Sequence, residues 1–335
     1  MKIEFCQIDI TGNCNLRCNY CRQSNEKDLP DTLSLDNFKD ILSQLRDLGC
    51  ERISIAGGEP LISKNFVPII KLSKKIIGDV SILTNGTLLT KKITTAMAPY
   101  VSMIQVSLDA MNPDLHDTIR GQTGLWLKTT KGIKTAIEAA IPTSVRITIS
   151  QQNKTEVIPL MQWANVQGAY SFLARRVVTT GKGKCVDKIP PQELKSIFQS
   201  MVQQAIKMNM RIGFGDPFPH LLLSPKRLDE ANNNIALRDG SIIGGCSVSV
   251  DAMYIAQNGD VLLCPYLPIK CGNVLQDSIA YIWQNAKAYK ITRSIRHNLK
   301  GKCGKCQYKF ACGGCRANAY YETGDICGPD NGCWL

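Results

Sequence analysis

The sequence predicts an α/β protein: a partial (β/α)6 barrel over residues 1–215, followed by a smaller cysteine-rich region over residues 216–335. Short apolar runs alternate six times with helical patterns in the first two thirds, which implies a parallel sheet with right-handed crossovers. No dinucleotide-binding glycine fingerprint follows the first run, so a barrel is favoured over a doubly wound sheet. The last forty residues are dense in glycine and cysteine and lack apolar periodicity.

The expected strands and helices follow one another in chain order. A strand over 3–10 leads into a cysteine-containing loop. Ser34 is a suitable N-cap for a helix that ends near Leu48, with Gly49 just beyond it. Further strands are expected at 52–56, 80–84, 103–107, 144–148 and 170–174. Helices are expected between them at 66–77, 91–98, 125–140 and 155–167.

The pattern changes after about residue 215. Two apolar runs, 253–256 and 261–264, flank Gln257-Asn258-Gly259-Asp260, and an Asn-Gly pair between such runs indicates a β-hairpin. The region beyond Asn298 has too few core residues to fold on hydrophobic burial alone, and metal clusters would supply the missing cross-links.

The cysteine content points to metal ligation. The N-terminus lacks the layout of a signal peptide and no apolar run approaches a membrane span, so we expect a cytoplasmic protein. Thiols stay reduced in the cytosol, and fifteen is an odd number, so disulfides are disfavoured.

The net charge of +12 counts every thiol as neutral. Thiolate ligation of three clusters would lower it to about +8. A basic holoprotein suits an acidic peptide or a carboxylated small molecule, although a merely solvated basic surface fits equally well. The lysines and arginines are scattered, without interleaved aromatic residues, which argues against nucleic acid.

Cys14, Cys18 and Cys21 form a C-x-x-x-C-x-x-C loop. A 4Fe–4S cluster is usually held by four cysteines. A loop that offers three leaves one iron open to a substrate or cofactor, as a catalytic zinc keeps an open position. A surface zinc is the alternative interpretation of the spacing.

This loop, Cys14-Asn15-Leu16-Arg17-Cys18-Asn19-Tyr20-Cys21, resembles the signature of radical S-adenosylmethionine (SAM) enzymes. Three further motifs match that family in register at the ends of the second, third and fourth expected strands. They are Gly57-Gly58-Glu59-Pro60, Thr84-Asn85-Gly86 and Ser107-Leu108-Asp109.

The resemblance implies that SAM chelates the open iron and is cleaved reductively to a 5′-deoxyadenosyl radical, which abstracts a hydrogen atom from the substrate. Gly57, Gly58 and Glu59 would bind SAM, with Glu59 accepting from its amino group. Ser107 and Arg146 would contact its carboxylate or ribose, although Arg146 could equally be a barrel-wall arginine paired to a carboxylate. Tyr20 would lie near the adenine.

The C-terminal third resembles the SPASM domain, which holds auxiliary iron–sulfur clusters. That domain carries the cysteine pattern C, G-x4-C, a gap, C-x2-C-x5-C-x3-C, a gap and a last C. This chain departs from it at one point, where two residues instead of three separate Cys312 from Cys315. A zinc ribbon is the alternative, but seven cysteines exceed the four that one structural zinc needs. The resemblance assigns the outer cluster to Cys303, Cys306, Cys312 and Cys333. It assigns the inner cluster to Cys246, Cys264 and Cys315, with Cys271, Cys327 or an open site in the fourth position.

Five cysteines stay outside these ligand sets, and a buried free cysteine usually serves as a small hydrophobe. Some SPASM-type epimerases use a free cysteine to return a hydrogen atom. Cys185, in a Gly-Lys-Gly-Lys-Cys loop, and Cys271 are the candidates for that catalytic role.

The favoured substrate is a ribosomally made precursor peptide that is crosslinked, epimerised or oxidised. Only thirteen residues precede Cys14, so a leader-binding domain would be a separate protein or absent. A flavodoxin- or ferredoxin-type protein would supply electrons. The alternatives are tetrapyrrole side-chain modification, another small-molecule oxidation or epimerisation, and an electron-transfer protein without chemistry of its own. Sulfatase-maturing relatives have an Asp that acts as a base directly after the second SPASM cysteine. In this sequence that cysteine is Cys264, and Pro265 and Tyr266 follow it, so the role is unfilled there.

Overall fold

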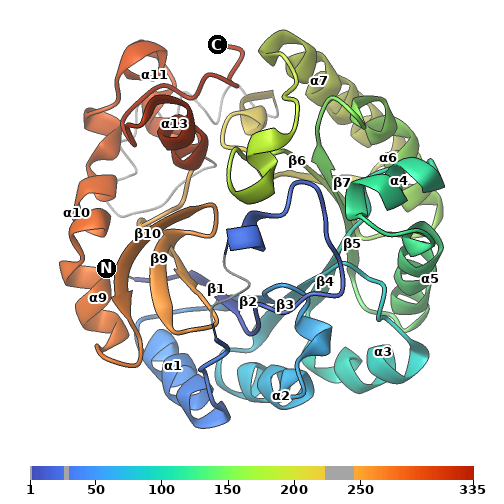
Figure 1. Ribbon diagram of the computed structural model, residues 1–335, viewed down its shortest axis with the longest axis horizontal. Helices are drawn as coiled ribbons and strands as arrows, with labels where there is room; N and C mark the ends of the chain where they lie inside the picture. The colour runs from blue at the N-terminus through green and yellow to red at the C-terminus, as the bar shows by residue number, and fades with distance from the viewer. Residues whose placement is uncertain (1, 26–29, 223–244) are drawn as a thin grey trace.

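The computed structural model describes residues 2–25, 30–222 and 245–335, and over these residues it contains one ten-stranded sheet (Figure 1). Its order is β10-β9-β8-β1-β2-β3-β4-β5-β6-β7. The barrel strands are β1 (Phe5–Asp9), β2 (Arg52–Ala56), β3 (Asp79–Thr84), β4 (Met103–Ser107), β5 (Thr143–Ile149), β6 (Ser171–Arg176) and β7 (Arg211–Phe214). All neighbours among them pair in parallel. The C-terminal strands are β8 (Ala252–Ile255), β9 (Asp260–Cys264) and β10 (Leu267–Asn273).

Helices cover the outside of the curved sheet (Figure 1). Those of the barrel are α1 (Leu35–Asp47), α2 (Phe66–Ile76), α3 (Lys91–Met97), α4 (Pro113–Arg120), α5 (Leu125–Glu138), α6 (Val157–Val166) and α7 (Pro191–Met208). The C-terminal region carries α9 (Ile279–Asn285), α10 (Lys287–Arg293), α11 (Gly301–Lys305), α12 (Lys309–Cys312) and α13 (Arg316–Thr323).

The main core lies between the strands and these helices. Alternate strand residues face the helices and are fully buried, which is the period-two pattern of a half-covered sheet. Ile82 on β3, Ile104 on β4 and Val145 on β5 are examples. The opposite alternation points polar side chains into the barrel, where a site can form.

The expected helix over 34–48 is confirmed. Ser34 and Asn37 form a reciprocal capping box at the start of α1, and Gly49 follows its end with a φ of 84°. Left-handed backbone of this kind favours glycine, so both ends of α1 are encoded locally.

The parallel part of the sheet is larger than the predicted six strands. β7 pairs with β6, and β8 pairs in parallel with the outer edge of β1. Neither α4, α7 nor β7 was expected. Both β7 and α4 are short, four and eight residues, so they carry little periodic signal.

The predicted hairpin is present as β8 and β9, but its turn differs from a two-residue Asn-Gly turn. Gly259 has a φ of 81°, and Asn258 is not among the non-glycine residues with positive φ. Ala256 N donates to Asp260 O and Gly259 N donates to Ala256 O, as in a three-residue loop with glycine last. Because this hairpin extends the barrel sheet, the domain boundary at 215/216 stays a prediction; residues 223–244 lie outside the described ranges.

None of the helices within the described ranges is both long enough and apolar enough to cross a bilayer.

Candidate active site

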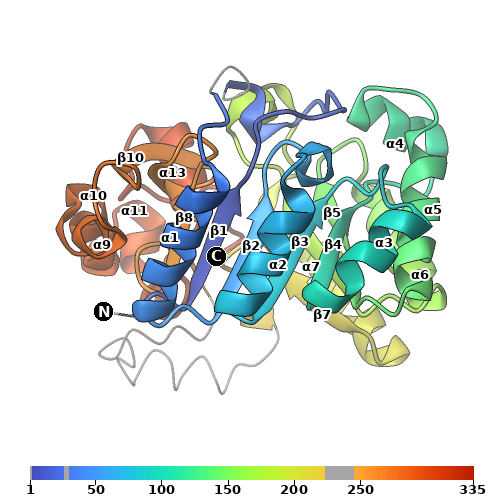
Figure 2. The ribbon, with the colours of Figure 1, turned by 90° about the horizontal axis from the view of Figure 1, so that it is seen from below.

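The loop with the three N-terminal cysteines lies at the carboxyl end of the barrel strands. Figure 2 shows this loop and α4 at the same end of the sheet. Cys14, Cys18 and Cys21 line one cavity of about 390 Å³, together with residues from β4, β5, β6, β8 and β9. The structure therefore brings the three predicted cluster ligands together on one wall of the barrel mouth.

Gly57 and Gly58 hold this loop against the end of β2. Gly58 N donates to Thr11 O over 2.8 Å, and Glu59 N donates to Asn13 O over 2.8 Å. A Cβ on Gly58 would lie 2.2 Å from Asn13 O, and one on Gly57 would lie 2.4 Å from Thr11 O. Backbone approach this close requires glycine. Two glycines predicted for SAM binding thus also seat the cysteine loop.

The C-terminal end of α4 holds the same loop from the other side. Asn19 N donates to Ile119 O over 2.9 Å, and a Cβ on Gly121 would lie 2.7 Å from Arg17 O. Asn112 caps the start of α4 by accepting from Leu115 N, and Gly121, with a φ of 83°, caps its end. Local capping signals therefore place the second support of the loop.

Asp109, which follows β4, is the buried hub of this end of the barrel. Its Oδ2 accepts from Tyr20 Oη at 2.6 Å and pairs with Arg120 Nε at 2.7 Å, while its Oδ1 accepts from Thr148 N at 3.0 Å. Its own N–H donates to His116 Nδ1. One carboxylate thus joins the cysteine loop, α4 and β5. The Tyr20 hydroxyl is used in this way, so only its ring is available near an adenine.

Arg120 provides the observation that tests whether an iron–sulfur cluster fits. Its Nη1 approaches Cys18 Sγ at 3.8 Å, and its buried Nη2 has no hydrogen-bond partner among the described residues. Burial raises the pKa of Cys14 to about 11 and also raises that of Cys18. Cysteine thiols lose their protons when they bind a cluster, because thiolates are the ligands. A guanidinium facing Cys18 favours that thiolate, so the site fits an iron–sulfur cluster.

A single metal ion is a poorer match. Over the described ranges, no three His, Cys, Asp or Glu side chains converge as they do around one ion. A cubane with four irons takes one thiolate at each iron corner and needs a wider set of ligands.

Glu59 is fully buried and is not among the residues that line the cavity. Its carboxylate accepts from Thr84 Oγ1 at 2.7 Å, Asn85 N at 2.7 Å and Leu61 N at 3.3 Å. Desolvation raises its pKa to about 7. The carboxylate therefore ties β2 to the end of β3, and its predicted contact with a SAM amino group stays a prediction.

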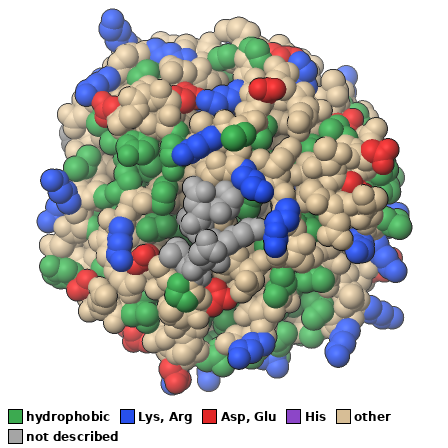
Figure 3. Space-filling model, viewed as in Figure 1, with side chains coloured by type: hydrophobic (Ala, Val, Ile, Leu, Met, Phe, Trp, Pro, Cys, Tyr) green, Lys and Arg blue, Asp and Glu red, His purple; other side chains and the backbone are tan. Residues whose placement is uncertain are grey.

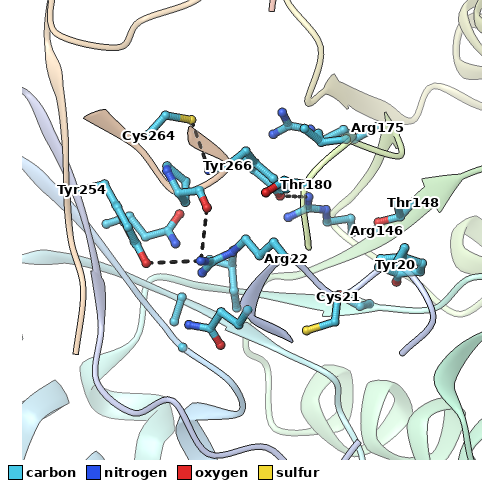
Figure 4. A pocket seen from close by; sticks show the side chains of 18 of the residues that line it. Tyr20, Cys21, Arg22, Arg146, Thr148, Arg175, Thr180, Tyr254, Cys264 and Tyr266 are labelled. Carbon is cyan, nitrogen blue, oxygen red and sulfur yellow. Dashed lines mark hydrogen bonds between the residues drawn. The ribbon is translucent and has the colours of Figure 1, made fainter. Parts of the chain in front are cut away.

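Ser107 and Arg146 are register partners on β4 and β5, and both line the cavity. Figure 4 shows Arg146 directed at Tyr266. Arg146 Nη2 donates to Tyr266 Oη at 3.0 Å, and Nη1 donates to Gln105 Oε1 at 3.3 Å. The alternative of a wall arginine paired to a carboxylate is not what the described residues show, because both of these partners are uncharged.

Sequence reasoning missed four residues that shape the cavity. Arg22 pairs with the buried Asp9 over 2.6 Å and contacts Tyr254 Oη at 3.2 Å (Figure 4). Its place directly after the last loop cysteine was the available signal. No sequence signal pointed to Arg120, Arg175 or Tyr266, because only the folded chain brings them to the cavity.

A second cavity of about 190 Å³ brings together the three predicted inner-cluster ligands, Cys246, Cys264 and Cys315. Burial raises the pKa of Cys264 to about 12, and the other two thiols add to the rise. Arg175 lines both this cavity and the larger one, and its Nη2 lies 4.0 Å from Cys315 Sγ. The two cavities therefore share a wall.

The predicted outer-cluster ligands come from the C-terminal helices and tail. Cys303 and Cys333 lie close enough to Cys312 to raise its pKa further, beyond the effect of burial. Backbone N–H groups donate to the thiols of Cys303, Cys306 and Cys312 over 3.3–3.4 Å. Such donors favour thiolates, as cluster ligation requires.

The remaining cysteines lie outside both cavities. Cys271 Sγ donates to Ile269 O over 3.7 Å, and burial raises its pKa to about 12. Cys327 is capped locally, its N–H donating to Asp325. Cys185 is exposed. The predicted hydrogen-donor roles of Cys185 and Cys271 and the fourth inner ligand stay predictions, while Cys6 and Cys50 are ordinary buried thiols.

Lysine and arginine side chains gather around the centre of the face seen in Figure 3. Lys182 and Lys184 belong to this end of the barrel, because Lys182 N donates to Cys21 O, and both side chains are exposed. The approach to the site is therefore basic, as the net charge suggested.

Two family models match the chain. The radical SAM superfamily model matches residues 8–164, and the model of an iron–sulfur cluster-binding domain, SPASM, matches residues 246–307. The chain belongs to the radical SAM superfamily. As a radical SAM enzyme with a SPASM domain, it uses a SAM-binding 4Fe–4S cluster and auxiliary iron–sulfur clusters.

Relatives of this radical SAM enzyme fall into two groups by name. An AdoMet-dependent heme synthase of Methanosarcina barkeri is 29% identical over 322 residues, which cover 95% of this chain and 92% of the relative. The antilisterial bacteriocin subtilosin biosynthesis protein AlbA of Bacillus subtilis is 26% identical over 96% of this chain and 69% of its own. The crystal structure of Streptococcus suis SuiB bound to precursor peptide SuiA superposes with a TM-score of 0.83 at 21% identity, covering 100% and 76% of the two chains.

Proposed function

We propose that this radical SAM enzyme modifies a ribosomally made precursor peptide by crosslinking, epimerising or oxidising one residue. The observation that carries this proposal is the size of the main cavity, about 390 Å³, which is near the lower end for ligand pockets. The same cavity has to admit SAM and the reacting part of the substrate. One peptide side chain reaching in from the surface needs less of the remaining space than a planar macrocycle.

The chain's own residues would position the reactants. Cys14, Cys18 and Cys21 would hold the cluster, and Ser107 with Arg146 would contact the carboxylate or the ribose of SAM. When bound, cluster and SAM together supply a 5′-deoxyadenosyl radical that takes a hydrogen atom from the substrate. The enclosing strands and the C-terminal hairpin would keep water from the reacting atoms.

The peptide proposal is also supported by relatives. AlbA is named for bacteriocin biosynthesis, and SuiB was crystallised with its precursor peptide. A basic approach to the site would attract an acidic leader peptide. A separate leader-binding protein and a flavodoxin- or ferredoxin-type reductant stay predicted partners, and the cytoplasm stays the predicted location.

A second candidate function is side-chain modification of a tetrapyrrole. It is favoured by one observation: the Methanosarcina barkeri heme synthase matches this chain over almost the whole length of both proteins, whereas AlbA is considerably longer. A tetrapyrrole with carboxylate side chains would also suit a cationic cavity.

One assay separates these functions. Anaerobically reconstituted protein, SAM and dithionite are incubated with the small peptide encoded beside the gene, or with an iron porphyrin carrying propionate side chains. We expect deoxyadenosine formation to rise severalfold with the peptide and a mass change in that peptide. Stimulation by the porphyrin alone would replace the peptide proposal. Absence of deoxyadenosine under every condition would contradict the enzyme and leave an electron-transfer protein. Cys14→Ala protein should form none.

A further inference from the structure

Two arginines from neighbouring strands meet on Tyr266 inside the main cavity (Figure 4). Arg146 Nη2 donates to Tyr266 Oη, and the guanidinium carbon of Arg175 lies 3.9 Å from the centre of the Tyr266 ring. Arg146 on β5 is opposite Leu173 on β6, and Thr148 is opposite Arg175. Both arginines therefore point to the same inner face of the sheet.

No carboxylate of the described residues pairs with either arginine. Over the part of the chain that the structure describes, neither Arg146 nor Arg175 forms an ion pair, and Arg175 Nε is buried without a hydrogen-bond partner. The other cavity arginines are each paired. Their partners are Asp9 for Arg22, Asp109 for Arg120, and Asp216 with Asp330 for Arg176.

An unpaired cation in a low-dielectric site is costly, so an anionic ligand is expected to complete it. SAM brings one carboxylate, and Ser107 and Arg146, adjacent register partners on β4 and β5, are the predicted contacts for this carboxylate or for the ribose. Arg175 lies one strand further on, beside the wall that separates the main cavity from the second one. A SAM carboxylate held beside Ser107 would leave Arg175, one strand further on, available for another anion.

We propose that Arg175, stacked on Tyr266, binds a carboxylate of the substrate. The ring fixes the plane of the guanidinium, and a planar fork of donors matches a carboxylate in two-point contact. This inference rests on the proposed function and narrows it to carboxylate-bearing substrates. In a peptide the carboxylate is an Asp or Glu side chain or the C-terminus, and in a tetrapyrrole it is a propionate.

The competing role for Arg175 is charge balance at the inner auxiliary site, because its Nη2 lies 4.0 Å from Cys315 Sγ. The two roles predict different consequences of losing the charge. A substrate ligand affects the preference for carboxylates, whereas a balancing charge affects the electronic properties of the metal centre.

The test compares matched probe pairs on holoprotein with SAM. One pair is acetyl-Gly-Glu-Gly-amide and its Gln counterpart; the other is a porphyrin tetracarboxylate and its tetramethyl ester. Dissociation constants are measured anaerobically by titration calorimetry. We expect one acid to bind at least about tenfold tighter than its neutral counterpart, and Arg175→Gln to abolish that preference. Arg175→Lys, which keeps the charge without the fork, should retain part of it.

Arg211→Gln is the matched control. Arg211 also stacks on a tyrosine, Tyr170 at 4.3 Å, but it is exposed and lines neither cavity. This variant should keep the full preference. Iron content and thermal unfolding report whether each variant is folded and loaded.

Two outcomes would overturn the inference: no preference for either acid, or an unchanged preference in Arg175→Gln. In the second case, a changed auxiliary-cluster EPR signal would assign Arg175 to charge balance at the inner site. Preference for the porphyrin acid alone, lost in Arg175→Gln, would support the inference while contradicting the peptide as substrate. The two proposals can therefore fail separately.

Discussion

Two buried carboxylates organise the barrel mouth in different ways. Asp109 is surrounded by a tyrosine, an arginine and two backbone contacts, and it joins three elements. Among the described residues, Glu59 has no cationic partner in hydrogen-bond contact; it accepts from two backbone N–H groups and one hydroxyl. Each of these side chains holds in place a strand end whose neighbouring residues line the cavity. Neither carboxylate lines the cavity itself.

Gly58→Ala should unseat the cysteine loop. The added Cβ would lie 2.2 Å from Asn13 O, so the loop has to move away from β2. We expect the variant to fold but to lose the N-terminal cluster, with iron content lower by about one third if three clusters are bound. Iron analysis and EPR check this. Gly213→Ala is the control, because its nearest contact, Leu173 Cδ1, is 3.3 Å away; equal iron loss there would contradict the argument.

Glu59 and His116 should give opposite pH dependences of stability. Desolvation raises the pKa of Glu59 from 4.5 to about 7, so its contribution is complete below pH 4.5 and is lost as pH rises through 7. Burial lowers the pKa of His116 from 6.5 to about 4, so its contribution is complete above pH 6.5 and is lost as pH falls through 4. Each amounts to roughly 3 kcal/mol, and between pH 4.5 and 6.5 they nearly cancel.

Single variants should reveal each slope. Glu59→Gln is expected to make the free energy of unfolding rise with pH over this range, and His116→Asn, whose Oδ1 can replace Nδ1 as acceptor, to make it fall. Denaturant unfolding at half-unit pH steps measures both. Slopes of the same sign in the two variants would show that the assignment is wrong.

At the scale of elements, the sequence encodes what is local. The bounds of β2 and β4 coincide with the expected ranges, and α1 has the expected capping residue, because periodicity and caps act within a few residues. The cysteine loop and strand-end motifs were likewise found from short patterns. The hub around Asp109 and the cluster of Arg175 on Tyr266 were not found, because their members lie 89 and about 90 residues apart and meet only through sheet register.

The C-terminal tail is attached to β6 by a buried ion pair. Arg176 contacts Asp216 at 2.7 Å and Asp330 at 2.6 Å, and Asp330 also accepts from Cys315 N at 2.8 Å. Asp330→Ala would leave a buried guanidinium with one partner fewer and an unpaired N–H. We expect a loss of about 3–5 kcal/mol in the free energy of unfolding, measured by denaturant titration.

Glu51→Gln, in the same denaturant titration, is the control for the loss of the buried Arg176–Asp330 pair. Glu51 pairs with Lys2, but both side chains are largely exposed, so solvent screens the contact and no measurable loss is expected. A similar, small effect in both variants would mean that the Arg176 network does not secure the tail.

At the scale of the whole molecule, one continuous sheet joins the barrel strands to the C-terminal strands β8–β10. β8 pairs with β1 on the edge opposite β2, so the C-terminal hairpin extends the barrel sheet instead of standing beside it. A chain truncated to residues 1–222 should therefore expose β1 as an edge and aggregate. A chain of residues 1–275, which keeps β8–β10, should be more soluble. Light scattering after refolding at equal concentration compares them, and equal solubility would contradict this role of the hairpin.

This pairing has a consequence for how the protein is made. Phe5 is opposite Ala252, so the chain as far as β8 has to leave the ribosome before the first strand gains its outer partner. Contacts so distant in sequence form late, and an unpaired strand edge invites association with other nascent chains. The cysteine loop that follows β1 is already synthesised during the time before β8 pairs with β1. Between synthesis of β7 and of β8 the barrel mouth would still be open on one side, which would leave the three loop cysteines accessible for cluster insertion.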